Sequence, residues 1–221
     1  MAKEKIIIFG NSDIAQLANY YFETDSNYEV VAFTVDGGYI SSDTFEGKPL
    51  IPFGVIDKTY PPSQFKMFIA LSYTNMNKLR ETKYHEAKAK GYTLVSYISS
   101  HCSYLSQFPC GDNCFILEDN TIQPFVKIGN NITLWSGNHI GHHSTIHDHN
   151  FISSHVVISG HCIIESNCFL GVNSTLAHNL TIAQETLLGA GCVIIQDTEA
   201  GRVYVPAKAR MLEQQSNKSK L

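Results

Sequence analysis

The sequence lacks a long apolar run and a block of basic residues, and each absence argues against a class of protein. Its first apolar run, residues 6–9, ends at Gly10 and is too short for a signal-peptide core or for a membrane span of about 20 residues. The 16 lysine and arginine residues are outnumbered by 20 aspartate and glutamate residues. We therefore expect a cytoplasmic protein with no membrane partner and no nucleic-acid partner.

The sequence also lacks a CxxC pair. The six cysteines are Cys102, Cys110, Cys114, Cys162, Cys168 and Cys192. Without a secretion signal, these spacings favour reduced thiols over disulfides and disfavour a zinc-thiolate site.

Short β-branched runs alternate with helical patterns over the first 100 residues. The expected strands cover residues 5–9, 28–35, 67–71 and 93–98, and the expected helices cover 14–22 and 75–90. Strands that alternate with helices form βαβ units. Residues 1–100 are therefore expected to form an α/β domain with a small parallel sheet, a Rossmann-like half, in which Asp13 caps the first helix.

After residue 100 the helical patterns stop, and an aliphatic residue recurs at every sixth position. These positions are Ile116, Ile122, Ile128, Leu134, Ile140, Ile146, Ile152, Ile158, Ile164, Leu170, Leu176, Ile182, Leu188 and Ile194. Neither a helix nor an antiparallel sheet has this period, whereas a parallel β-helix built from hexapeptides does. Residues 101–221 are expected to form such a β-helix with a C-terminal tail, its triangular coils stacked about 4.8 Å apart.

The residue four places after each aliphatic position is also expected to point inward, where only small or medium side chains fit. This set includes Val126, Ser144, Val156, Cys162, Cys168, Ser174, Thr186 and Cys192. The register therefore assigns three cysteines to the interior, as small apolar fillers.

Histidines are concentrated in and after the stretch from Gly137 to Asn150. They are His139, His142, His143, His147, His149, His155 and His161. Residues 18 apart share a column of the β-helix, so His143 shares a column with His161, and His142 shares one with Gly160. The register thus spreads the run around three sides of a prism, and we expect the solvent-facing rings to include those of His139, His147, His149 and His161.

Two segments resemble a known family. Residues 167–174, NCFLGVNS, and residues 205–208, VPAK, resemble a coil and the closing segment of the left-handed β-helix acyltransferases. With the N-terminal sheet and its glycine turn, the chain is similar to the two-domain sugar acetyltransferases of the NeuD/PglD type. The resemblance implies a homotrimer, acetyl-CoA in the groove between neighbouring β-helices, and one histidine that acts as a base.

The resemblance also implies the catalytic residues. The family's histidine lies about 29 residues before the glycine of the FLG segment, here Gly171, which points to His142. Histidine titrates near pH 6.5 and can take a proton from an attacking amine or hydroxyl. The family has a glutamate directly after this histidine, where this sequence has His143, and Asp148 is a candidate replacement for that carboxylate.

Binding residues follow from the same resemblance. The acetyl-CoA candidates are Gly160, Val172, Gly189, Ala190, Lys208 and Arg210, the last two for the phosphates. The acceptor candidates are Gly10, Asn11, Ser12, Asp13, Asp36, Ser72, Tyr73 and Arg80. The turn after the first strand is not GxGxxG, but a helix N-terminus there can hold a phosphate, and Asp36 is placed to accept hydrogen bonds from a ribose or a base.

The resemblance implies an acetyl-CoA-dependent acetyltransferase that acts on the amino group of a nucleotide-linked amino sugar. Such a reaction belongs to surface-glycan synthesis (lipopolysaccharide O-antigen or capsule), with acetyl-CoA as co-substrate and no metal. The nucleotide can be UDP, GDP or dTDP. Three alternatives stay open: O-acetylation of a sialic acid or another sugar hydroxyl, a zinc hydratase of the γ-carbonic anhydrase type with histidines from two subunits, and a non-catalytic scaffold.

Overall fold

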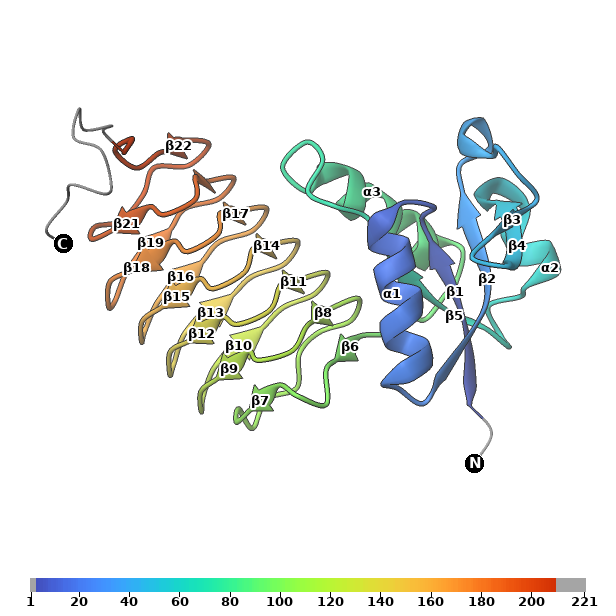
Figure 1. Ribbon diagram of the computed structural model, residues 1–221, viewed down its shortest axis with the longest axis horizontal. Helices are drawn as coiled ribbons and strands as arrows, with labels where there is room; N and C mark the ends of the chain where they lie inside the picture. Colours follow the sequence, from blue (N-terminus) through green and yellow to red (C-terminus); the bar gives the residue numbers. More distant parts are fainter. Residues whose placement is uncertain (1–2, 210–221) are drawn as a thin grey trace, which may run out of the picture.

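The computed structural model describes residues 3–209, which form an α/β domain followed by a long left-handed β-helix (Figure 1). The fold class expected from the sequence is confirmed. None of the helices within residues 3–209 is long and apolar enough to cross a membrane.

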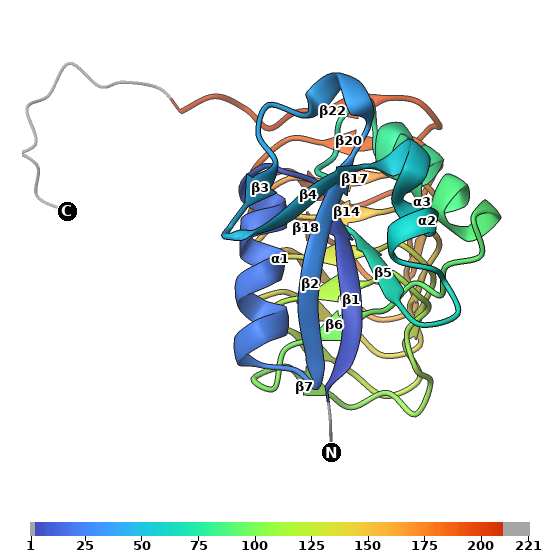
Figure 2. The same cartoon turned by 90° about the vertical axis from the view of Figure 1, so that its right-hand side faces the viewer.

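A five-stranded sheet of order β3-β4-β2-β1-β5 forms the centre of the α/β domain, with β3 antiparallel to β4 and the other pairs parallel. Its strands are β1 (Glu4–Phe9), β2 (Tyr28–Val35), β3 (Thr44–Phe45), β4 (Lys48–Pro52) and β5 (Lys66–Ile69). The helices are α1 (Asp13–Thr24), α2 (Ile56–Thr59) and α3 (Lys78–Ala89), with 3₁₀ turns η1 (Gly37–Tyr39) and η2 (Phe53–Val55). Figure 2 shows α1 on one face of the sheet and α2 and α3 on the other.

Alternation along β1 builds the core on both faces of this sheet. Ile6 and Ile8 join the buried cluster that contains Phe22 of α1, whereas Ile7 and Phe9 join the cluster on the opposite face. A parallel strand covered on both faces has apolar residues at every position, which explains the continuous run from Ile6 to Phe9.

The β-helix consists of two-residue strands in three parallel sheets. Sheet I contains β7 (Ser103–Tyr104), β9 (Thr121–Ile122), β12 (His139–Ile140), β15 (Val157–Ile158), β18 (Thr175–Leu176) and β21 (Val193–Ile194). Sheet II contains β10 (Lys127–Ile128), β13 (Thr145–Ile146), β16 (Ile163–Ile164) and β19 (Thr181–Ile182). Sheet III contains β6 (Tyr97–Ile98), β8 (Phe115–Ile116), β11 (Thr133–Leu134), β14 (Phe151–Ile152), β17 (Phe169–Leu170), β20 (Leu187–Leu188) and β22 (Val203–Tyr204). The corners between strands are named here by the sheets they join: the I–II, II–III and III–I corners.

The interior of the β-helix confirms the six-residue register. Every aliphatic position of the repeat is buried, and so are Cys162, Cys168 and Cys192. Asn138 and Asn150 occupy two further inward positions. Their side-chain oxygens accept hydrogen bonds from backbone N–H groups of the next coil, at 2.7 Å and 2.6 Å, so these polar side chains are satisfied inside the prism.

Two boundaries differ from the expectation. Residues 93–98 add no regular strand to the five-stranded sheet, because Leu94 makes only one isolated bridge to it and β6 pairs with β8 of the β-helix. Helix α3 begins at Lys78 because Asn75, Met76 and Asn77 have positive φ angles of 51°, 49° and 65°, outside the right-handed helical region. The β-helix therefore starts at Tyr97.

Helix α3 docks on the II–III corners through buried polar contacts. The Arg80 side chain is 1% exposed, and its guanidinium donates hydrogen bonds to Thr133 Oγ1 at 3.1 Å and to the carbonyl oxygen of Asn150 at 2.9 Å. Buried Asn77 donates to the carbonyl oxygen of Cys168 at 3.0 Å. The expectation that Arg80 lines an acceptor site is therefore wrong: its guanidinium is enclosed between the two domains and joins them.

Candidate active site

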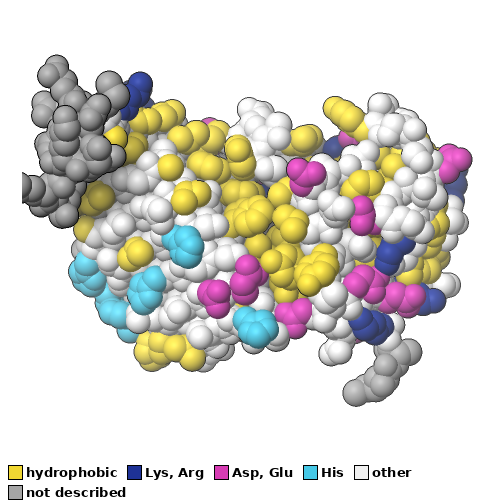
Figure 3. Space-filling model, viewed as in Figure 1, with side chains coloured by type: hydrophobic (Ala, Val, Ile, Leu, Met, Phe, Trp, Pro, Cys, Tyr) yellow, Lys and Arg dark blue, Asp and Glu magenta, His cyan; other side chains and the backbone are white. Residues whose placement is uncertain are grey.

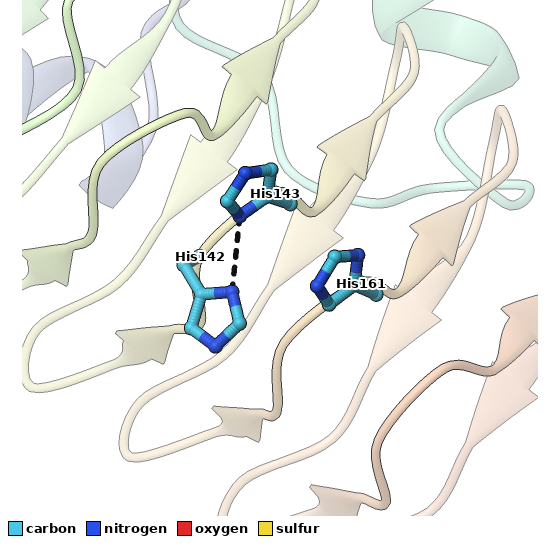
Figure 4. Close-up of side chains that lie close together, drawn as sticks. All are labelled: His142, His143 and His161. Atoms are coloured by element: carbon cyan, nitrogen blue, oxygen red, sulfur yellow. Dashed lines mark hydrogen bonds between the residues drawn. The ribbon is translucent and has the colours of Figure 1, made fainter.

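His142 lies on a I–II corner of the β-helix, between β12 and β13, with its ring exposed. Its backbone N–H donates a hydrogen bond to Gln123 Oε1 at 2.8 Å, which anchors the corner. The nearest polar partner of its ring is the next residue: Nδ1 of His142 lies 3.1 Å from Nδ1 of His143 (Figure 4). One of these two nitrogens must carry the proton that joins them.

His143 is held by stacking. Its ring lies parallel to that of His161, 4.8 Å away at an angle of 8°, and against Phe125 at 4.6 Å. Both histidines have positive φ angles, 59° and 61°, at equivalent corners one coil apart, so the repeat itself aligns the rings. When His142 donates through Nδ1–H to this fixed ring, its Nε2 holds a free lone pair, the state that a general base needs.

Gly160 lies beside His142 on the next coil, as the column assignment predicted. A Cβ atom at this position would lie 2.8 Å from Cε1 and 2.9 Å from Nε2 of His142. The corner therefore requires glycine if the ring is to keep this orientation.

Asp148 does not orient His142. It lies on a II–III corner, where its Oδ1 accepts a hydrogen bond from the backbone N–H of Asn130 at 2.7 Å. The expectation that Asp148 replaces the family's glutamate is therefore wrong, and His143 occupies that place.

His149 is not exposed, contrary to expectation. Only 6% of the residue is accessible, because α3 covers its II–III corner and brings Tyr84 and His85 against its ring. Burial lowers the pKa of His149, although Glu81 opposes the shift. His147 and His161 are exposed as expected, and His139 is half-buried.

A cleft of about 420 Å³ lies between the two domains. Its lining combines residues expected for the acceptor, Ser72 and Tyr73, with two expected for acetyl-CoA, Val172 and Ala190. On the face drawn in Figure 3, hydrophobic side chains gather between the β-helix and the α/β domain. The cleft thus brings together candidates that are about 100 residues apart in the sequence.

Three aromatic residues of this cleft, Trp135, Phe151 and Phe169, were missed by the sequence analysis, whereas Tyr73 was among the acceptor candidates. The ring of Tyr73 packs against Phe151 at 5.0 Å and Phe169 at 4.6 Å, and Trp135 lies in the same lining. Phe151 and Phe169 directly precede inward aliphatic residues and are 18 residues apart. Two aromatics at outward positions of one column were the signal that could have identified this wall.

A second cleft, of about 230 Å³, lies at the carboxyl ends of β1 and β2. It brings together Gly10, Asn11, Ser12 and Asp36. Gly10 has a φ angle of 137°, and a Cβ there would lie 2.7 Å from a backbone carbonyl oxygen, so this turn needs glycine. Asp13 is exposed and absent from both linings, and Ser12 precedes α1 as its N-cap in place of Asp13.

Lys83 is a charged residue of the second cleft that the sequence did not reveal. Its Nζ lies 2.9 Å from Asp36 Oδ1 and 2.7 Å from Glu86 Oε2. Partial burial opposes protonation, but these two carboxylates raise the pKa of Lys83, so the side chain is an ammonium ion. Asp36 therefore faces the cleft as part of an ion pair.

Of the remaining acetyl-CoA candidates, the structure describes Gly189 and Lys208 but not Arg210. Gly189 lies under the closing segment, where a Cβ would meet the carbonyl oxygen of Tyr204 at 3.3 Å, and Lys208 is exposed. Arg210 lies outside the described residues. His142 lies on a I–II corner, whereas the interdomain cleft opens beside III–I corners, so one chain does not bring His142 and the cleft together.

No protein-family model and no curated protein matches the chain. Solved structures do match over nearly its whole length. The acetyltransferase domain of PglB from Neisseria gonorrhoeae FA1090 has a TM-score of 0.82 at 19% identity, covering 95% of this chain and 100% of that one. PerB from Caulobacter crescentus, solved with CoA and GDP-perosamine, has a TM-score of 0.79 at 18% identity and coverages of 91% and 94%. WeeI from Acinetobacter baumannii AYE has a TM-score of 0.77 at 20% identity and coverages of 95% and 100%. At these identities the likeness establishes a shared two-domain fold.

Proposed function

We propose that this chain is an acetyl-CoA-dependent acetyltransferase that acts on the amino group of a nucleotide-linked amino sugar. The observation that carries the proposal is the 3.1 Å contact between Nδ1 of His142 and Nδ1 of His143 on an exposed corner. If the shared proton lies on Nδ1 of His142, Nε2 of the same ring is free to accept a proton. The fold supports the choice of substrates, because structures that share it include one solved with acetyl-CoA and one solved with CoA and GDP-perosamine.

His142 acts as the general base in this proposal. The sugar amine attacks the thioester carbonyl carbon of acetyl-CoA while Nε2 of His142 takes the amine proton. The C–S bond then breaks, and the proton on His142 passes to the departing CoA thiolate. His143 accepts a hydrogen bond from Nδ1–H of His142 and so keeps the ring in the tautomer that can take a proton.

In this proposal, the interdomain cleft binds acetyl-CoA, the acyl donor. Val172 and Ala190 lie on successive III–I corners, where backbone amides can meet the amide groups of the pantetheine arm. Gly189 lies at the same corner as Ala190, close to the backbone of Tyr204. Lys208 of the closing segment and Arg210, two residues further along the sequence, are the proposed partners of the CoA phosphates.

The second cleft receives the nucleotide. Gly10, Asn11 and Ser12 stand at the N-terminus of α1, where the helix dipole and free N–H groups favour a diphosphate. Asp36 accepts hydrogen bonds from the ribose or the base, while Lys83 offsets its charge. Asp13 lies outside the lining of this cleft but in the first turn of α1, where its negative charge would disfavour a nearby phosphate. The sugar would then extend past Ser72 and Tyr73 into the interdomain cleft.

A homotrimer completes the site in this proposal. One chain separates His142 from the interdomain cleft by a full side of the prism, so a neighbouring β-helix must bring its own His142 to the cleft. Three copies around a threefold axis give three equivalent sites, each built from two chains. We place the reaction in the cytoplasm, as a step in the synthesis of a surface glycan.

An assay of CoA release tests the proposed function. Acetyl-CoA is supplied with UDP-, GDP- or dTDP-linked amino sugars, and with a free sialic acid as the O-acetylation control. Release that depends on one nucleotide-linked amino sugar is the expected result. Release with the sialic acid alone would replace the amine acceptor by a hydroxyl, and no release with any acceptor would contradict the proposal.

A further inference from the structure

His142, His143 and His161 form a compact group of exposed imidazoles within one chain. Each ring offers a nitrogen, and these three nitrogens all lie within 4.8 Å of one another. His178, one coil further along the same corner, places its ring 5.2 Å from that of His161. The repeat therefore builds a patch of imidazoles whose nitrogens converge.

The spacing within this group suits one metal ion. Two imidazole nitrogens bound to the same tetrahedral zinc at about 2.0–2.1 Å lie about 3.3 Å apart. The Nδ1 atoms of His142 and His143 are already 3.1 Å apart. The ring of His161 needs only to tilt toward this pair, which an exposed ring can do.

The type of ligand also suits a transition-metal ion. Three imidazoles favour borderline cations such as Zn²⁺ or Ni²⁺, whereas Mg²⁺ and Ca²⁺ prefer oxygen ligands.

A second group, Glu81, His85 and His149, has similar spacing but the wrong tautomer. Asn113 Oδ1 accepts from the backbone N–H of Ile69, and Asn113 Nδ2 donates to Asn131 Oδ1. Asn131 Nδ2 is thereby directed at Nδ1 of His149, 2.8 Å away. This buried chain of amides makes Nδ1 an acceptor and leaves the proton on Nε2, the nitrogen that faces Glu81. The exposed pair of His142 and His143 has no such constraint, because their shared proton can move to an Nε2 open to solvent.

We propose that His142, His143 and His161 of one chain bind a borderline divalent transition-metal ion, and that the bound ion inhibits the enzyme. Coordination through Nδ1 of His142 forces its ring proton onto Nε2, and Nε2 then has no lone pair for the substrate amine. Binding follows from the geometry alone, whereas the inhibitory consequence rests on the proposed function.

Calorimetric titration of tag-free, chelator-treated protein with ZnCl₂ tests the site. His161→Asn removes one ligand, and asparagine tolerates the positive φ angle of this position. His147→Asn is the matched control, since His147 is exposed but outside the group. We expect one Zn²⁺ per chain in the wild type and in His147→Asn, and a loss of affinity of at least about tenfold in His161→Asn.

The same variants test inhibition. In the CoA-release assay, Zn²⁺ should inhibit the wild type and His147→Asn, and EDTA should restore activity. His161→Asn, compared with its own metal-free rate, should need about tenfold more Zn²⁺ for the same fractional inhibition. Equal zinc affinity in the wild type and His161→Asn, or no binding by the wild type, would overturn the site. Binding without inhibition would overturn the inhibitory role alone. Were no acceptor acetylated, the calorimetry would still decide whether the site exists.

Discussion

The Nδ1 atoms of His142 and His143 lie 3.1 Å apart, and the ring of His143 is itself held in a stack between Phe125 and His161. An imidazole thus stands where the sugar acetyltransferases that the sequence resembles have a carboxylate. A neutral ring can fix the orientation and tautomer of His142, but it stabilises the protonated ring less than a carboxylate does.

Replacing His142 by alanine should remove most of the turnover and leave the fold intact. Loss of a general base costs about 10²- to 10⁴-fold in rate, and the exposed ring contributes little to packing. Steady-state CoA release and thermal unfolding would measure the two effects. A kcat close to that of the wild type would remove His142 from the mechanism.

His143→Glu should keep activity and shift its pH dependence. A carboxylate next to His142 favours the protonated ring, so the acid limb of the pH–rate profile should move to higher pH. Glutamate is compatible with the backbone, since Glu185 has a φ angle of 57° at another corner. His143→Asn is the control without a charge. Identical pH profiles in both variants and the wild type would show that residue 143 does not contact the base.

Gly160→Ala should lower kcat while leaving thermal stability nearly unchanged. The new Cβ would lie within 3 Å of the His142 ring and displace it, which an exposed ring can accommodate without loss of packing. Kinetics and thermal unfolding of this variant, beside His142→Ala, would separate the two effects. Wild-type kcat would mean that the orientation of this ring does not matter.

Arg80→Met should destabilise the protein and have no specific effect on substrate binding. The substitution removes the buried Arg80 donor from the carbonyl oxygen of Asn131 and from Asn77 Oδ1, at a cost of about 1–3 kcal/mol for each unsatisfied group. Denaturant unfolding should show the loss, while the KM values for both substrates should stay close to wild type. A large rise in the acceptor KM at unchanged stability would instead restore the substrate-binding role.

Inactive variants should complement one another if the site spans two chains. His142→Ala removes the base, and Ala190→Trp fills the interdomain cleft, which Ala190 lines. Co-expressed, the two should form mixed trimers in which some sites have an intact cleft and an intact His142. Recovery of activity, with a trimeric mass by light scattering, is the expected result. A monomeric mass together with no recovery would contradict the shared site.

The β-helix and its columns could be predicted from the repeat. An aliphatic residue at every sixth position fixes which side chains point inward and which residues, 18 apart, share a column. The same spacing correctly placed Gly160 beside His142 and three cysteines in the interior of the β-helix. It could not predict the burial of His149 or Arg80, because both depend on α3 docking against corners that follow it by 50 to 70 residues in the sequence. Tyr73 was expected in the acceptor site, but its partners Phe151 and Phe169 were missed. Their spacing of 18 residues places them in one column, whereas nothing in the repeat indicates that the other domain packs against that column.

The mass of the product shows directly whether the protein transfers an acetyl group to the amino sugar. Wild-type protein and His142→Ala are each incubated with acetyl-CoA and a nucleotide-linked amino sugar, and the nucleotide sugar is analysed by mass spectrometry. We expect the wild type to add one acetyl group to the amine, and His142→Ala to form this product at least about a hundredfold more slowly. An unmodified nucleotide sugar from the wild type with every nucleotide tested, or equal product from both proteins, would contradict this expectation.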